Sequence, residues 1–212
     1  MTEQPEADGE LRPDIEQWAL AHGFTPSERA LRGETSLLRL GMMDMTAAAY
    51  AGAVAGRDAL LAEFSIGSPS ISDAFGGSGV QGSWFTLFLL DVDAAAWPRL
   101  TVQPGRFHDG DWLARLLHRD DHPVRGIGAE FDRLYHVRAD RSVTDERLGR
   151  LFDADFVSWC VAQGELVFDV EQGDTGGHLV VARRGIGIGD EALTSLLAQA
   201  EHVAARLASA ST

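Results

Sequence analysis

The amino-acid sequence predicts an α+β fold: a mostly antiparallel sheet, a short N-terminal helix, a mid-chain pair of helices and a long C-terminal helix packed on the sheet. Strand-like segments follow one another in the first half of the chain. Two short helical patterns with capping residues then occur in succession over 142–163, and an apolar stripe at helical spacing closes the chain over 193–207. This order favours antiparallel pairing, because a parallel sheet would need alternating strands and helices.

The first predicted helix spans residues 13–22. Pro13 suits the first position of a helix, and Gly23 suits the left-handed residue that ends one. Between them, apolar side chains recur at helical spacing, with Trp18 as the largest. The pattern therefore predicts a short amphipathic helix that Trp18 anchors to the core.

Two strands and a long loop are predicted next. The strands are expected at 48–54 and 59–65, with a hairpin turn at 56–58. The stretch 67–83 is rich in Gly and Ser and too polar for a core strand, so we expect a mobile loop with a functional role. Because this loop contains the isolated apolar residue Phe75, we expect Phe75 to dock on a partner or in a pocket of the protein itself.

Three further strands follow from the hydrophobic pattern. The stretch 84–92, WFTLFLLDV, is the most hydrophobic and predicts a central strand. The short segment 100–102 lies between Pro98 and Pro104, which is typical of an edge strand. Alternation over 131–138 predicts a strand with one side partly exposed to water.

The second half of the chain contains clear helix signals. The sequence SVTD at 142–145 fits a capping box, and Asp153 is predicted to cap a second short helix. Two segments separated by GDTGG, 166–170 and 179–182, predict a hairpin. Asp190 is predicted to cap the long closing helix.

Domain organisation and location follow from the polar segments. Residues 1–12 are charged and show no periodicity, so we expect a disordered lead-in without the features of a signal peptide. Residues 13–212 are expected to form a single α+β domain, or two subdomains with a seam in the charged stretch 119–125. Since the apolar runs are short and broken by charge, we expect a soluble, cytoplasmic protein.

Charge and cysteine content exclude several classes of function. The chain has 32 acidic and 18 basic residues, all of the latter arginine, for a formal net charge of −14. A field of this sign repels phosphate backbones and anionic lipids, so we expect no nucleic-acid partner. The single cysteine, Cys160, leaves no internal disulfide and no Cys-based zinc site, and its place on an apolar stripe predicts a core residue.

No motif predicts catalysis, a cofactor or a metal. The sequence RRGIGIGD at 183–190 is placed like a dinucleotide loop, but its third glycine position falls on Asp190, whose charge would oppose a pyrophosphate. The sequence HRDDH at 118–122 contains metal-ligand types, but Pro123 argues against the helix that would bring both histidines to one ion. We therefore assign no catalytic, cofactor-binding or metal-binding residue, and whether the protein is an enzyme stays open.

Several short motifs occur in a characteristic order. They are AHGF at 21–24, WPRLTVQP at 97–104 and EFDRLYHVRAD at 130–140, followed by the closing amphipathic helix. In these motifs the chain resembles, over roughly residues 13 to 207, a group of uncharacterised actinobacterial soluble proteins. The resemblance implies no catalytic residues.

Two hypotheses of function remain at this point. The first is a non-enzymatic cytoplasmic accessory or regulatory module that contacts another protein or a second copy of itself. Its candidate interaction surface consists of Phe75, Arg133, Tyr135, His136 and Arg138. The alternative is a small-molecule or lipid-binding domain, with a pocket between the sheet and the closing helix that Trp84, Phe88 and Tyr135 would line.

Overall fold

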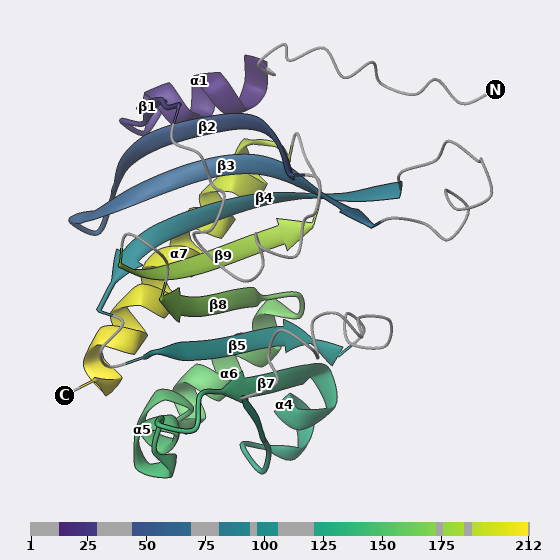
Figure 1. The fold of residues 1–212 in the computed structure, drawn as a ribbon, viewed down its shortest axis with the longest axis vertical. Helices are drawn as coiled ribbons and strands as arrows, with labels where there is room; N and C mark the ends of the chain where they lie inside the picture. The colour runs from purple at the N-terminus through teal and green to yellow at the C-terminus, as the bar shows by residue number, and fades with distance from the viewer. Residues whose placement is uncertain are drawn as a thin grey trace.

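The computed structural model describes residues 13–28, 44–68, 81–93, 97–105, 121–172, 176–184 and 188–211. Its helices are α1 (Pro13–Ala21), α4 (Ala129–Leu134), α5 (Asp145–Leu151), α6 (Ala154–Gln163) and α7 (Asp190–Ala210). Its strands are β1 (Thr25–Pro26), β2 (Asp44–Val54), β3 (Arg57–Ser68), β4 (Gln81–Val92), β5 (Arg99–Pro104), β6 (His122–Val124), β7 (Tyr135–Ala139), β8 (Val167–Gln172) and β9 (Gly177–Arg184). The strands form one antiparallel sheet in the order β1-β2-β3-β4-β9-β8-β5-β7-β6 (Figure 1).

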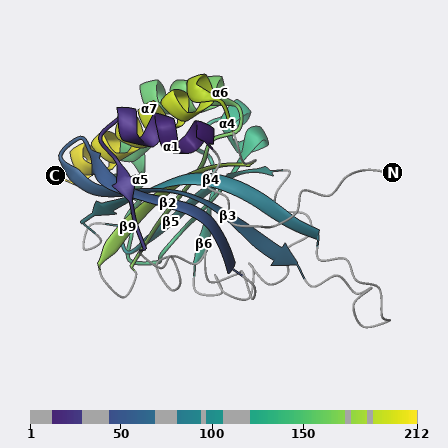
Figure 2. The same ribbon diagram turned by 90° about the horizontal axis from the view of Figure 1, so that it is seen from above.

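The helices of the described chain gather on one face of this sheet (Figure 2). The arrangement confirms the predicted α+β class, with a short first helix and a long last helix. None of the helices described is long and apolar enough to cross a membrane.

Residues 1–12 lie outside the described part. Strand β6, within the candidate seam 119–125, pairs with β7 in the same sheet, and the division into subdomains stays a prediction.

The hairpin of β2 and β3 turns one residue earlier than predicted. Val54 pairs with Arg57, so Ala55 and Gly56 alone form the turn. Both have positive φ angles, 50° and 75°, as a two-residue type I′ turn requires. On β2, Gly52 leaves room for the ring of Phe24, whose Cδ1 would lie 2.7 Å from a Cβ at that position.

Strands β3 and β4 extend into the segment predicted as a loop. Gly67 pairs with Gly82 and Ser68 pairs with Gln81, so the prediction of a loop over 67–83 is wrong at both of its ends. Backbone pairing needs no apolar side chain, which is why polar composition was misleading here. The centre of the segment, with Phe75, lies outside the described residues.

Two other strand predictions need correction. The segment 100–102 belongs to β5, which lies between β8 and β7 and is therefore not an edge strand. Pro98 precedes this strand and Pro104 ends it, so neither removes a hydrogen bond from its middle. The predicted strand over 131–138 begins as the helix α4 instead, and β7 starts only at Tyr135.

The helix caps agree with the sequence in part. Asp153 caps α6 as predicted, because its Oδ1 accepts the backbone N–H of Phe156 at 2.9 Å. Thr144, rather than Ser142, caps α5 and accepts from the N–H of Arg147 at 3.3 Å. Gly189 precedes α7 without a side-chain cap, so the predicted capping by Asp190 is wrong.

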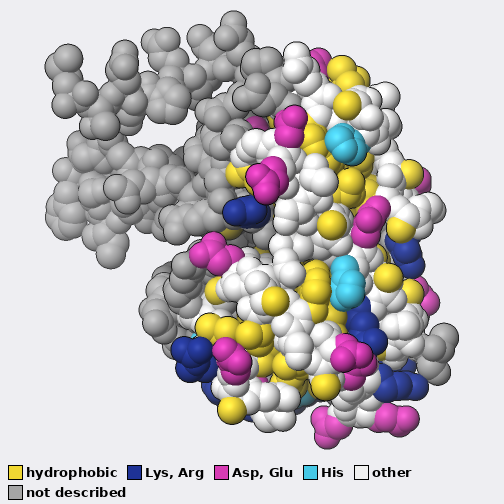
Figure 3. Space-filling view, turned by 180° about the vertical axis from the view of Figure 1, so that it is seen from behind, with side chains coloured by type: hydrophobic (Ala, Val, Ile, Leu, Met, Phe, Trp, Pro, Cys, Tyr) yellow, Lys and Arg dark blue, Asp and Glu magenta, His cyan; other side chains and the backbone are white. Residues whose placement is uncertain are grey.

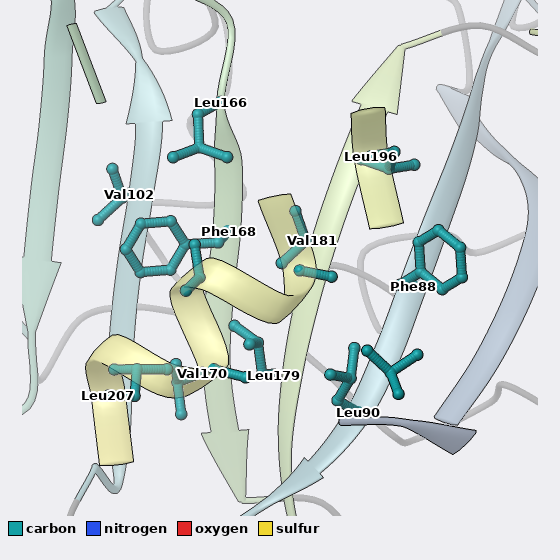
Figure 4. Close-up of a cluster of buried hydrophobic side chains, with 14 of the residues drawn as sticks. Phe88, Leu90, Val102, Leu166, Phe168, Val170, Leu179, Val181, Leu196 and Leu207 are labelled. Atoms are coloured by element: carbon teal, nitrogen blue, oxygen red, sulfur yellow. The ribbon is translucent and has the colours of Figure 1, made fainter. Parts of the chain in front are cut away.

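The larger of two buried hydrophobic clusters lies between the sheet and the helices. The buried stripe of α7 covers β4 and β9, and Figure 4 shows Leu196 toward Phe88 and Leu207 toward Val170. The stripe consists of Leu193, Leu196, Ala200, Val203, Ala204 and Leu207. It confirms that the predicted helix over 193–207 is continuous and packs on the sheet.

Candidate functional site

The structure separates the residues predicted to form an interaction surface. Tyr135, His136 and Arg138 lie on β7, where alternation places Tyr135 on the helix-covered face and the other two on the opposite face. Arg133 lies on α4, and Phe75 is outside the described residues. Only His136 and Arg138 therefore share a face of the sheet.

Tyr135 is a core residue. Its side chain is 3% exposed, its ring stacks on Phe131 at a centroid distance of 5.0 Å, and its hydroxyl donates to the carbonyl of Cys160 at 2.8 Å. Burial raises the pKa of Tyr135 to about 12, although a backbone hydrogen bond from Leu166 acts in the opposite direction. Tyr135 thus anchors β7 to α6 and presents little of its side chain to solvent.

Arg133 is at the other extreme. Its side chain is 71% exposed and lies 3.9 Å from the equally exposed carboxylate of Glu130, one turn earlier on α4. An exposed pair at this distance contributes little to stability. Arg133 is therefore a solvent-exposed charge on α4.

A pocket of about 170 Å³ opens where β6 ends beside β7. The last pair between the two strands is Val124 with Val137, so the first two residues of β7 extend beyond β6. No other strand of the described chain pairs with β7 on this side. The pocket is lined by Pro123, Val124, Arg125, Asp132, Tyr135, His136, Val137 and Arg138.

The walls of this pocket are held by specific contacts. The carboxylate of Asp132 accepts the N–H of Gly126 at 2.8 Å, which fixes the turn after β6. The guanidinium of Arg138 donates to the carbonyl of Asp121 at 3.0 Å, just before β6 begins. His136 lies against Gly105 at the end of β5, where a Cβ would come within 3.3 Å of its Nε2.

Arg125 lines the pocket and directly follows the last residue of β6. Arg125 is an exposed residue. In the ranges that the structure describes, Arg125 has no ion-pair partner. Among the described residues it is therefore a charged donor in the pocket lining that no carboxylate pairs with.

A row of polar side chains crosses the sheet face away from the helices. Asp91, His178, Glu171 and Arg99 are direct neighbours on β4, β9, β8 and β5. His178 Nδ1 lies 3.1 Å from Asp91 Oδ1, and Arg99 Nη1 donates to Asp121 Oδ1 at 3.0 Å. The row therefore ends at Asp121, the residue whose carbonyl also holds Arg138.

Several of these polar side chains are buried. His178, Glu171 and Asp121 are each at most 5% exposed, and so is Asp169, which accepts a hydrogen bond from Thr101 at 2.8 Å. Buried charges of this kind are stable only when they are paired. Since Arg99 neutralises Asp121 next to β6, the row positions the segment that leads into the pocket.

Sequence reasoning did not identify this row, nor Arg125 and Asp132 at the pocket. A usable signal was present in the strand VFDVEQ, where two acidic residues alternate with apolar ones. The residues beside these acidic side chains on neighbouring strands are distant in the sequence. Only the strand register brings them together.

The arrangement offers no metal centre or activated nucleophile in the described part of the chain. Within those residues, no three His, Cys, Asp or Glu side chains are grouped so that they could hold a metal ion. Cys160 is fully buried on the apolar stripe of α6, and burial raises the pKa of its thiol to about 12. The thiol is therefore neutral and inaccessible at physiological pH.

The residues proposed for a pocket under the closing helix do not meet. Phe88 on β4 and Tyr135 on β7 are four strand spacings apart, or about 19 Å. Phe88 is fully buried beneath α7 in the packed core. The side chain of Trp84 lies outside the described ones. Comparison with protein-family models, curated proteins and solved structures gives no match to this chain.

Proposed function

We propose that the protein is a non-enzymatic cytoplasmic accessory or regulatory module that binds an extended segment of another protein at the β6–β7 edge of its sheet. We also propose that it belongs to the actinobacterial group that it resembles. The observation that carries the first proposal is the pocket beside the end of β6, at a place where β7 extends beyond its neighbour.

The size of the pocket favours a polypeptide over a free metabolite. Sites for small molecules enclose about 300–1,000 Å³, whereas a cavity of about 150 Å³ holds a single benzene ring. The pocket of about 170 Å³ therefore matches one side chain. A side chain binds with useful affinity only when the rest of its segment also makes contacts.

The sheet edge supplies such contacts. An exposed strand edge presents backbone N–H and C=O groups, and extended peptides add to it as a further strand, with pockets selecting their side chains. Strand β7 extends beyond β6 at Tyr135 and His136, next to the pocket, and the N–H of Tyr135 already donates to the carbonyl of Phe131. In the described chain, no strand pairs with this stretch on the β6 side.

The face seen in Figure 3 presents no surface of one uniform character among the described residues. Seen from behind, acidic and basic side chains are interspersed among apolar ones (Figure 3). The apolar side chains between the sheet and α7 pack on one another, which disfavours the alternative of a lipid or small molecule held there. In the described part of the chain, the edge pocket combines a cavity with polar side chains and a strand edge.

A photo-crosslinking residue at position 123 tests the proposal. Pro123 is exposed, lines the pocket and lies on β6 opposite Arg138 of β7. A crosslinker at Ala198, exposed on α7, provides the matched control. Irradiation in host cells is expected to give a covalent polypeptide adduct from position 123 and none from position 198. Absence of an adduct at 123, or equal adducts at both positions, would contradict the proposed function.

A further inference from the structure

We infer that the β6–β7 pocket binds a carboxylate group of the partner segment, from an Asp or Glu side chain or from a C-terminus. This inference rests on the proposed function and specifies the chemistry of the same site. It follows from which charges line the pocket, from how they are held and from which of them has a partner.

The pocket is locally basic in an acidic protein. Arg125, His136 and Arg138 line it, against the single carboxylate of Asp132. That carboxylate already accepts the N–H of Gly126, so one of its oxygens is engaged in the turn. The chain as a whole has 32 acidic and 18 basic residues, so a pocket with two arginines departs from its average charge.

Arg138 supplies a positive charge at a defined position. One of its terminal nitrogens donates to the carbonyl of Asp121, and that residue's carboxylate is paired with Arg99. A guanidinium has five N–H donors in a planar fork, so a hydrogen bond to a fixed backbone carbonyl orients the group. Arg138 therefore orients the pocket wall and contributes to its positive potential.

Arg125 supplies the donor that would bind the ligand directly. Among the described residues it has no ion-pair partner, although it lines the same pocket. Arginine recognises carboxylates through two parallel hydrogen bonds. A basic side chain in this pocket would instead face two arginines, which disfavours a basic partner segment.

Peptides with alternating residues test this inference, because alternation places every second side chain on one face of an added strand. The probes are fluorescent, capped octapeptides of valine alternating with glutamate, glutamine or lysine, and a glutamine peptide with a free C-terminus. Binding is measured by fluorescence anisotropy. We expect the glutamate peptide to bind about five- to tenfold more tightly than the capped glutamine peptide, and the lysine peptide to bind most weakly. High salt should reduce the difference.

Variants connect the affinity to the pocket. Arg125→Ala is expected to weaken binding of the glutamate peptide about five- to tenfold, whereas Arg125→Lys should retain part of the affinity. Arg150→Ala removes the same charge from an exposed site on α5 and should leave binding unchanged. Tight binding of the glutamine peptide only with a free C-terminus would identify the terminal carboxylate as the source.

Three results would overturn the inference. They are equal binding of the capped glutamate and glutamine peptides, no effect of Arg125→Ala, and tighter binding of a phosphoserine peptide than of the glutamate peptide. If position 123 still crosslinks to a polypeptide in any of these cases, the proposed function stands and only the carboxylate chemistry is wrong. If position 123 gives no adduct and no peptide binds, both are wrong.

Discussion

The guanidinium of Arg206 on α7 forms an ion pair with the carboxylate of Asp153, the residue that caps α6. The same side chain donates to the carbonyls of Leu151 at 3.2 Å and Arg150 at 2.7 Å, at the end of α5. One arginine thus satisfies the last carbonyls of one helix and pairs with the cap of the next. Arg206 on α7 therefore connects the end of α5 with the start of α6.

The charge of Asp153 is expected to contribute a pH-dependent part of the stability. The N–H of Phe156, and then Arg206, hold the pKa of Asp153 below its usual value of 3.8. The folded state then binds fewer protons than the unfolded state, so the stabilisation is present above the unfolded pKa and is lost as the pH falls through the folded pKa. Asp153→Asn keeps a capping side chain but removes this charge.

We therefore expect Asp153→Asn to be less stable than the wild type near neutral pH and equally stable in acid. Denaturant unfolding at several pH values measures the gap. Asp155→Asn removes an exposed carboxylate from the first turn of the same helix and serves as the control. A gap that persists unchanged in acid would show that the charge of Asp153 has no such role.

Arg206→Ala is expected to lower the free energy of unfolding by about 1–3 kcal/mol. Its removal leaves two helix-terminal carbonyls without their donor and Asp153 without its ion pair. Arg150→Ala, which removes an exposed arginine on α5, should change the value by less than about 0.5 kcal/mol. Equal effects of the two substitutions in urea unfolding would contradict a specific role for Arg206.

Cys160 is expected to be chemically inert in the folded protein. Burial raises the pKa of its thiol from 9.0 to about 12, so a thiol reagent should react only as fast as the protein opens. Above pH 9 the unfolded thiol ionises while the folded one stays protonated, so stability should fall as the pH rises. Cys160→Ala removes this term at a cost of about 1 kcal/mol at neutral pH.

Two measurements check this expectation. The gap in stability between the wild type and Cys160→Ala should narrow as the pH rises above 9. Labelling of the native protein should be slow, and labelling in denaturant should be immediate. Rapid stoichiometric labelling of the native protein would instead indicate an accessible thiolate.

The closing helix illustrates what local patterns predict well. Its stripe from Leu193 to Leu207 is buried as the 3.6-residue period requires, because one face of a long helix must cover the sheet. The N-cap residue is harder to predict. Gly189 and Asp190 are adjacent, and the sequence does not show at which of them the helical backbone begins.

Local alternation was insufficient at the start of β7. The pattern over 131–138 fits a strand, but Phe131 and Tyr135 are also one helical turn apart and stack on each other. Phe131 further packs against Phe152, which belongs to a later part of the chain. The tertiary contact decides between helix and strand, and it is invisible in the local sequence.

The candidate site was predictable only by residue type. The sequence indicates His136 and Arg138 as basic residues on one predicted strand, and the structure places both at the pocket. Arg125 joins them because the chain turns after β6, and Arg99 reaches Asp121 because β5 and β6 both pair with β7. These relations depend on pairing between distant segments, which no local pattern contains.

The turn between β2 and β3 offers a stabilising substitution. Ala55 has a φ of 50°, in the left-handed region that costs an ordinary L-residue roughly 1–2 kcal/mol. Asn tolerates this conformation better than Ala, and Asn-Gly is the preferred pair in a type I′ turn. Because residue 55 is exposed and Gly56 already follows it, Ala55→Asn is expected to raise the free energy of unfolding by about 0.5–1 kcal/mol.

The matched control for this turn is Ala53→Asn. Residue 53 is also exposed but lies within β2, where Asn is unfavourable, so this change should be neutral or destabilising. Denaturant midpoints of the two variants and the wild type provide the comparison. If Ala55→Asn gains no more than Ala53→Asn, the turn does not store the backbone cost that its φ angles imply. Ala55→Gly should gain less than Ala55→Asn, since glycine also increases the entropy of the unfolded chain.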